Sequence, residues 1–71
     1  MKLYMFKSET RKDLRGFAGD STGAGMPAHL GPWRAVGVVT EGKAPPHKLS
    51  RDKIEKSIEE QGFQLWRLRA D

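Results

Sequence analysis

The pattern of hydrophobic and polar positions is most regular between residues 49 and 68, where it predicts a helix followed by a strand. Ser50 is a favoured helix N-cap, because its hydroxyl can accept a hydrogen bond from an amide of the first turn. Ile54 and Ile58 lie one turn apart and form a narrow apolar stripe. Gly62 suits the left-handed residue that ends many helices. The pattern therefore predicts a helix over residues 50–61, laid on one face of a sheet, and a strand over residues 63–68.

Three further segments have the composition of strands. Residues 2–7 contain four consecutive large apolar side chains, which is typical of a strand covered on both faces, so we expect this strand at the centre of the sheet. Residues 33–40 are rich in β-branched side chains and predict another strand. Residues 14–18 are a possible strand, the second arm of a hairpin, although Gly16 weakens that prediction.

Residues 19–32 contain several glycines and two prolines, which predict turns and an irregular loop. A loop of this length is unusual in a small domain and is either functional or packed onto the domain as a lid. Met26 and Leu30 are apolar, and we expect them to cover the sheet face that the helix does not reach.

These elements predict an α+β fold in a single small domain. We expect a mostly antiparallel sheet of three or four strands, with the helix of residues 50–61 on one face and the long glycine-rich loop on the other. The chain has 71 residues and no cysteine, so disulfides and thiolate zinc sites are excluded. It has no apolar run long enough for a transmembrane helix or a secretory signal, and we expect a cytoplasmic protein.

The charge balance favours an anionic partner. Thirteen Lys and Arg residues stand against nine Asp and Glu residues, which gives a net charge of +4. The same excess is also an ordinary way to stay soluble, so it is not specific to one kind of partner.

Neither a cofactor nor a metal is predicted. Residues 19–25 (GDSTGAG) resemble a phosphate-binding loop only in their glycines, because Met26 and Pro27 stand where a lysine and a Ser or Thr are needed. His29 and His47 are the two histidines, and neither has the sequence spacing of a metal ligand. We expect a plain loop and two histidines without a metal.

An enzyme is not predicted either. The hydroxyl groups available as nucleophiles lie outside any nucleophile-elbow motif, and Ser50 is already explained as a helix cap. The paired carboxylates Glu59 and Glu60 lie on the charged side of the predicted helix. A domain of this size also has little room for a closed pocket.

The stronger prediction is a binding surface in which aromatic rings lie beside cations on the predicted strands. Such a surface can stack bases while the cations contact phosphates. For the rings themselves we favour the simpler interpretation, that Phe6, Trp33, Phe63 and Trp66 form the core, because a chain with six aromatic residues needs them there. In the last strand, alternation places Gln64, Trp66 and Leu68 on one face and Phe63, Leu65 and Arg67 on the other. The residues predicted to contact a partner are Lys2, Arg34, Trp66, Arg67 and Arg69.

Several segments, taken together, resemble small bacterial proteins of unknown function. These segments are residues 6–9 (FKSE), 13–20 (DLRGFAGD), 30–33 (LGPW), 45–47 (PPH) and 62–67 (GFQLWR). The resemblance implies a bacterial cytoplasmic setting and assigns no role to any residue.

Two functions remain open from the sequence. The first is a non-enzymatic interaction module that docks on a larger protein or a protein–nucleic-acid complex through a basic, aromatic-bearing surface. The second is direct, weakly specific binding of nucleic acid. Salt separates them, because binding to phosphates weakens steeply with ionic strength whereas docking through apolar side chains does not.

Overall fold

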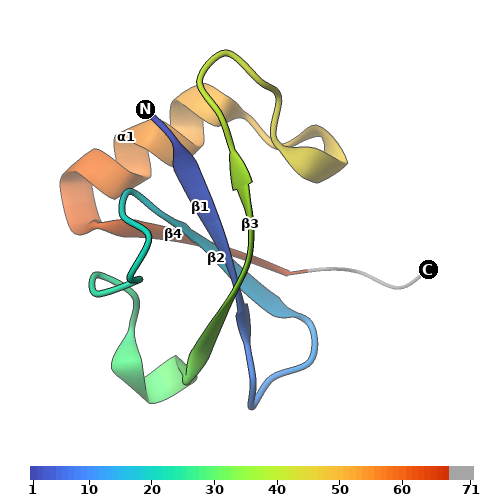
Figure 1. The fold of residues 1–71 in the computed structure, drawn as a ribbon, viewed down its shortest axis with the longest axis vertical. Helices are drawn as coiled ribbons and strands as arrows, with labels where there is room; N and C mark the ends of the chain where they lie inside the picture. The colour runs from blue at the N-terminus through green and yellow to red at the C-terminus, as the bar shows by residue number, and fades with distance from the viewer. Residues whose placement is uncertain (68–71) are drawn as a thin grey trace.

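A computed structural model describes residues 1–67, apart from the side chain of His47, and shows one antiparallel sheet with a helix on it (Figure 1). The four strands stand in the order β3-β1-β2-β4. Two short 3-10 helices, η1 (Ala28–Leu30) and η2 (Pro46–Lys48), lie in the connections. The main elements in chain order are β1 (Leu3–Ser8), β2 (Leu14–Ala18), β3 (Trp33–Val39), α1 (Arg51–Gln61) and β4 (Phe63–Arg67).

This architecture confirms the predicted α+β class. All three strand pairings are antiparallel, and β1 lies inside the sheet. The first strand is shifted by one residue from the predicted range 2–7, and the third ends at Val39 rather than Thr40. The predicted end of the last strand, Leu68, lies outside the described residues.

Helix α1 is capped at its start by the side chain of Ser50 and at its end by the backbone of Gly62. The Ser50 hydroxyl accepts a hydrogen bond from the Lys53 amide at 3.3 Å. Gly62 adopts a left-handed conformation with φ of +94°, and its amide donates to the Ile58 carbonyl at 2.8 Å. A residue with a Cβ is strained in that conformation, so glycine fits the end of the helix.

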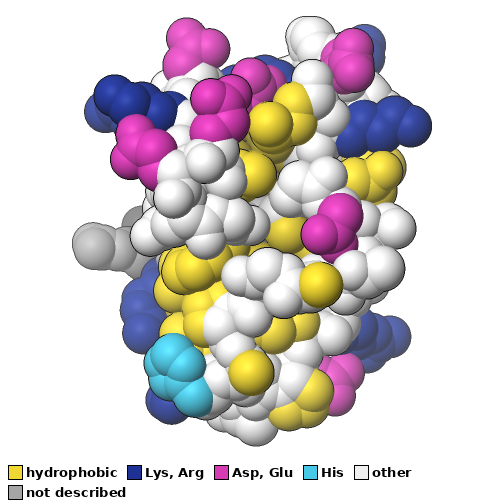
Figure 2. Space-filling model, turned by 90° about the vertical axis from the view of Figure 1, so that its left-hand side faces the viewer, with side chains coloured by type: hydrophobic (Ala, Val, Ile, Leu, Met, Phe, Trp, Pro, Cys, Tyr) yellow, Lys and Arg dark blue, Asp and Glu magenta, His cyan; other side chains and the backbone are white. Residues whose placement is uncertain are grey.

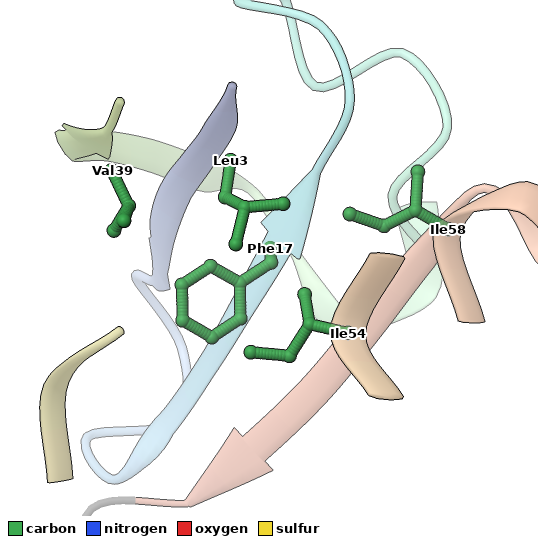
Figure 3. Packing of buried hydrophobic residues seen from close by; sticks show 5 residues of the cluster. All are labelled: Leu3, Phe17, Val39, Ile54 and Ile58. Atoms are coloured by element: carbon green, nitrogen blue, oxygen red, sulfur yellow. The ribbon is translucent and has the colours of Figure 1, made fainter. Parts of the chain in front are cut away.

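The core on the helix side of the sheet is formed by five buried apolar residues. Figure 3 shows Ile54 and Ile58 pointing from α1 towards Phe17 and Leu3 of the sheet. Val39, at the end of β3, completes this cluster. Leu3 and Phe17 are fully buried, with 0% of their surface exposed, so β1 and β2 hold the helix against the sheet.

A second core fills the opposite face, where the loop after β2 folds back. Met26, 6% exposed, packs with Phe6 and Ala18, and four partly buried residues surround them: Tyr4, Trp33, Phe63 and Leu65. A Cβ at Gly16 would collide with Met26 Cε, so this glycine makes room for the methionine in the strand. Seen from the side on which the loop lies, hydrophobic side chains gather at the centre of the surface and Lys and Arg lie at its margins (Figure 2).

The pairing of β1 with β3 contains one irregularity. Met5 pairs with Gly37 and Phe6 pairs with Ala35, so Val36 is an extra residue in β3. Val36 and Val38 are about half exposed, at 47% and 46%, on this edge strand. A bulge of this kind bends a strand and re-aims the side chains beyond it, here Arg34. Among residues 1–67, no helix is both long and apolar enough to cross a membrane.

Candidate functional site

Four side chains form one row across all four strands of the sheet. Arg34 of β3 lies opposite Lys7 of β1, Lys7 lies opposite Arg15 of β2, and Arg15 lies opposite Trp66 of β4. Directly paired residues of antiparallel strands project from the same face of the sheet, with about 5 Å between Cβ atoms. We call Arg34, Lys7 and Arg15 the cationic row; Trp66 marks its end.

The cationic row lies on the helix side of the sheet. Side chains alternate along a strand, so Lys7 projects to the same face as Met5, and Arg15 to the same face as Phe17. Phe17 belongs to the core cluster with the helix residues, and Met5 packs against it. Arg34 is exposed and Lys7 and Arg15 are half-buried. The row therefore lies at the border between the helix-side core and solvent.

No acidic side chain neutralises the cationic row within residues 1–67. The ion pairs there join the N-terminal amine to Glu41, Arg51 to Glu55 and Arg67 to Asp13. The Nε of Arg15 is buried and has no hydrogen-bond acceptor in that part of the chain. Like charges directly opposite each other destabilise a sheet, and an anion bound over the row would remove that cost.

A hollow of about 280 Å³ lies at one end of the cationic row. Lys7 and Arg34 line it together with Lys12, Ser8 and Glu9, so three cations face one carboxylate. The hollow therefore extends the positive surface beyond the sheet.

A second pocket, of about 190 Å³, lies at the other end, between the start of α1 and β4. Its apolar walls are Phe17, Leu49, Ile54 and Trp66. The rings of Phe17 and Trp66 stack with their centroids 6.0 Å apart and their planes 19° from parallel. We call this space the Trp66 pocket. The row thus runs between a charged hollow and an aromatic pocket.

The predicted contact residues are distributed over several places. Arg34 and Trp66 lie in the same row but on opposite edge strands. Arg67 follows Trp66 and so projects from the opposite face, where its guanidinium lies 3.1 Å from an Asp13 carboxylate oxygen. Lys2 is exposed just before β1. Arg69 lies outside the described residues.

Lys7 and Arg15 were not among the predicted contact residues, although they connect Arg34 to Trp66. Lys7 follows a run of apolar side chains, and Arg15 lies in the strand that Gly16 made uncertain. Alternation with Phe17 places Arg15 on the helix side, but only the strand register shows that Lys7 is its neighbour.

Two amides of the glycine-rich loop, those of Thr22 and Gly23, donate hydrogen bonds to a side chain of the same loop. One Asp20 carboxylate oxygen accepts hydrogen bonds from the amides of Thr22 and Gly23, both at 2.9 Å, and from the Thr22 hydroxyl at 2.7 Å. The hydroxyl of Thr22, helped by these amides, lowers the pKa of Asp20. The amides of Thr22 and Gly23 are therefore satisfied by a side chain of the loop itself.

His29 is exposed, and the side chain of His47 lies outside what the structure describes. The described residues contain no group of three His, Asp or Glu side chains able to hold a metal ion. The cationic row is therefore the arrangement with the clearest chemistry. Comparison with protein-family models, with curated proteins and with solved structures finds no match for this chain.

Proposed function

We propose that this protein is a non-enzymatic interaction module that docks, through the cationic row, on a larger protein or a protein–nucleic-acid complex in the bacterial cytoplasm. The observation that carries the proposal is the alignment of Arg34, Lys7 and Arg15 in one register row without an acidic partner in the described chain. Three cations held on a sheet form a rigid surface for a partner that carries negative charge.

The rest of the molecule supports a binding role over catalysis. Among the described residues, Ser8 carries the one fully buried hydroxyl, and it is engaged with backbone groups of residues 10, 11 and 30. The carboxylate of Asp20 is engaged with its own loop. The cationic row, in contrast, has no acidic partner within residues 1–67, and its Arg34 is exposed.

Direct, weakly specific binding of nucleic acid is the second candidate function. The observation that favours it is the Trp66 pocket at the end of the row, because basic grooves that bind single strands commonly include aromatic platforms.

A pull-down from native bacterial lysate tests the proposed function. The bait is the tagged protein, compared with Lys7→Glu, which reverses the charge at the centre of the row. Lys56→Glu is the matched control, because Lys56 is exposed on α1, away from the row. We expect the wild type and Lys56→Glu to retain the same partner and Lys7→Glu to lose it. Equal capture by all three baits contradicts the proposal.

Salt and nuclease then separate the two candidate functions. A protein partner that persists at moderate salt after nuclease treatment supports docking on a protein. A partner that disappears with nuclease supports contact with nucleic acid.

A further inference from the structure

We propose that the anionic group met by the cationic row is the backbone of a single-stranded nucleic acid, and that the Trp66 pocket takes one of its bases. This inference rests on the proposed function, because it uses the same row as the contact surface. It adds a ligand class and a second contact point.

The spacing of the cationic row suits a phosphate backbone. Neighbouring strands lie about 4.8 Å apart, so the step from Trp66 through Arg15 and Lys7 to Arg34 covers roughly 15 Å. Within a stacked strand one phosphate follows about every 3.4 Å of axis, so several phosphates lie along such a distance. The cations of the row can therefore contact phosphates of one strand.

The Trp66 pocket has the size and walls for one planar ring. Its volume of about 190 Å³ is below the ~300 Å³ at which ordinary ligand pockets begin, so it is too small for a larger ligand. The indole of Trp66 stacks on the buried ring of Phe17, which holds it in place. A base that enters the pocket lies against a fixed aromatic wall.

Polar groups of the Trp66 pocket favour a base over an acidic side chain. The Gln64 amide nitrogen donates to the Leu65 carbonyl at 2.7 Å, which leaves its oxygen as an acceptor. Ser50 accepts from the Lys53 amide, so its hydroxyl proton is still available to donate. Lys53 adds an ammonium donor at the pocket. Donors and an acceptor together match the edge of a base, whereas an acidic side chain needs donors alone.

The partner must be single-stranded. A base that is paired and stacked in a duplex cannot enter a pocket beside the sheet, whereas an unpaired base can turn out of its strand. Recognition by stacking and phosphate contacts predicts only a weak sequence preference.

Fluorescence anisotropy with matched oligonucleotides tests the inference. The probes are a single strand of about 12 nucleotides, an abasic strand with the same number of phosphates, the duplex of the same sequence, and polyglutamate as an acidic polypeptide. At ~0.1 M salt, we expect the intact single strand to bind at least ~5-fold more tightly than each of the other three.

Two variants separate the pocket from the cationic row. Gln64→Leu is expected to reduce the difference in affinity between the intact and the abasic strand, since it removes the acceptor and leaves the row unchanged. Lys7→Glu is expected to lower the affinity for both strands by similar factors. Lys56→Glu is expected to bind like the wild type.

The outcomes distinguish a failure of this inference from a failure of the proposed function. Equal affinity for the intact and abasic strands overturns the base pocket and leaves the row as a docking surface. Polyglutamate binding as tightly as the single strand overturns the choice of nucleic acid. An unchanged affinity of Lys7→Glu for every probe contradicts the row itself, and with it the proposed function.

Discussion

At the scale of single residues, Ser8 shows how a polar side chain can fix a loop to a sheet. It is only 1% exposed, and its hydroxyl donates to the Leu30 carbonyl at 2.7 Å. The same oxygen accepts from the amides of Thr10 and Arg11 at 3.3 and 3.2 Å. Ser8 therefore joins the turn after β1 to the end of the long loop.

We expect Ser8→Ala to lower the free energy of unfolding by about 2 kcal/mol, because the buried hydroxyl serves one carbonyl and two amides in part-buried hydrogen bonds that are lost together. Urea unfolding followed by circular dichroism measures the change. Ser21→Ala is the control: Ser21 is exposed, and its loss should change the free energy by less than ~0.5 kcal/mol. If both variants lose the same small amount, the Ser8 hydroxyl does not hold the loop.

At the scale of elements, Arg51 connects the start of α1 to two other parts of the chain. Its Nε lies 2.8 Å from Glu55, one turn further along the helix. One terminal nitrogen donates to the carbonyls of Thr40 and Lys43, each at 3.0 Å, and the other donates to the Met1 carbonyl. The helix is thus held to the turn after β3 and to the residues before β1.

We expect Arg51→Lys to cost about 1–2 kcal/mol of unfolding free energy although it keeps the charge, because an ammonium group cannot reproduce the planar set of donors. Thermal unfolding measures the loss. Lys56→Ala removes an exposed charge from the same helix and should change the free energy by less than ~0.5 kcal/mol. A neutral Arg51→Lys would mean that charge alone, and not the hydrogen bonds, stabilises this corner.

The elements were predictable because their signals are local. Ser50 and Gly62 mark the helix ends, Ile54 and Ile58 its buried face, and β-branched residues mark the third strand. The cationic row was not predictable, because it depends on which residues of distant strands pair. The extra residue Val36 decides the face of Arg34: without it, every side chain of β3 before the bulge would project from the other side. No local sequence pattern predicts that Val36 is the extra residue.

At the scale of the whole molecule, the cationic row lowers the stability of the fold through charge repulsion, while the same charges serve binding. Lys7 lies between two cations, Arg34 and Arg15, in directly opposed positions. A carboxylate there would convert two repulsive cross-strand pairs into two attractive ones.

We therefore expect Lys7→Glu to raise the free energy of unfolding by about 0.5–1 kcal/mol at low salt, even though it removes binding. Chemical unfolding at low and high ionic strength measures the gain, which should shrink as salt screens the charges. Lys56→Glu, which places a carboxylate one turn from Asp52 and from Glu60, should instead lower the stability slightly. A loss of stability in Lys7→Glu would show that the row is not under repulsion in the free protein.

The repulsion within the cationic row also has a consequence for the amount of protein in a cell. A cost of about 1 kcal/mol raises the unfolded fraction roughly fivefold, and proteases act on that fraction. A partner that neutralises the row favours the folded form by mass action. We expect copies without a partner to be degraded faster than bound copies, so that the abundance of this protein follows the abundance of what it binds.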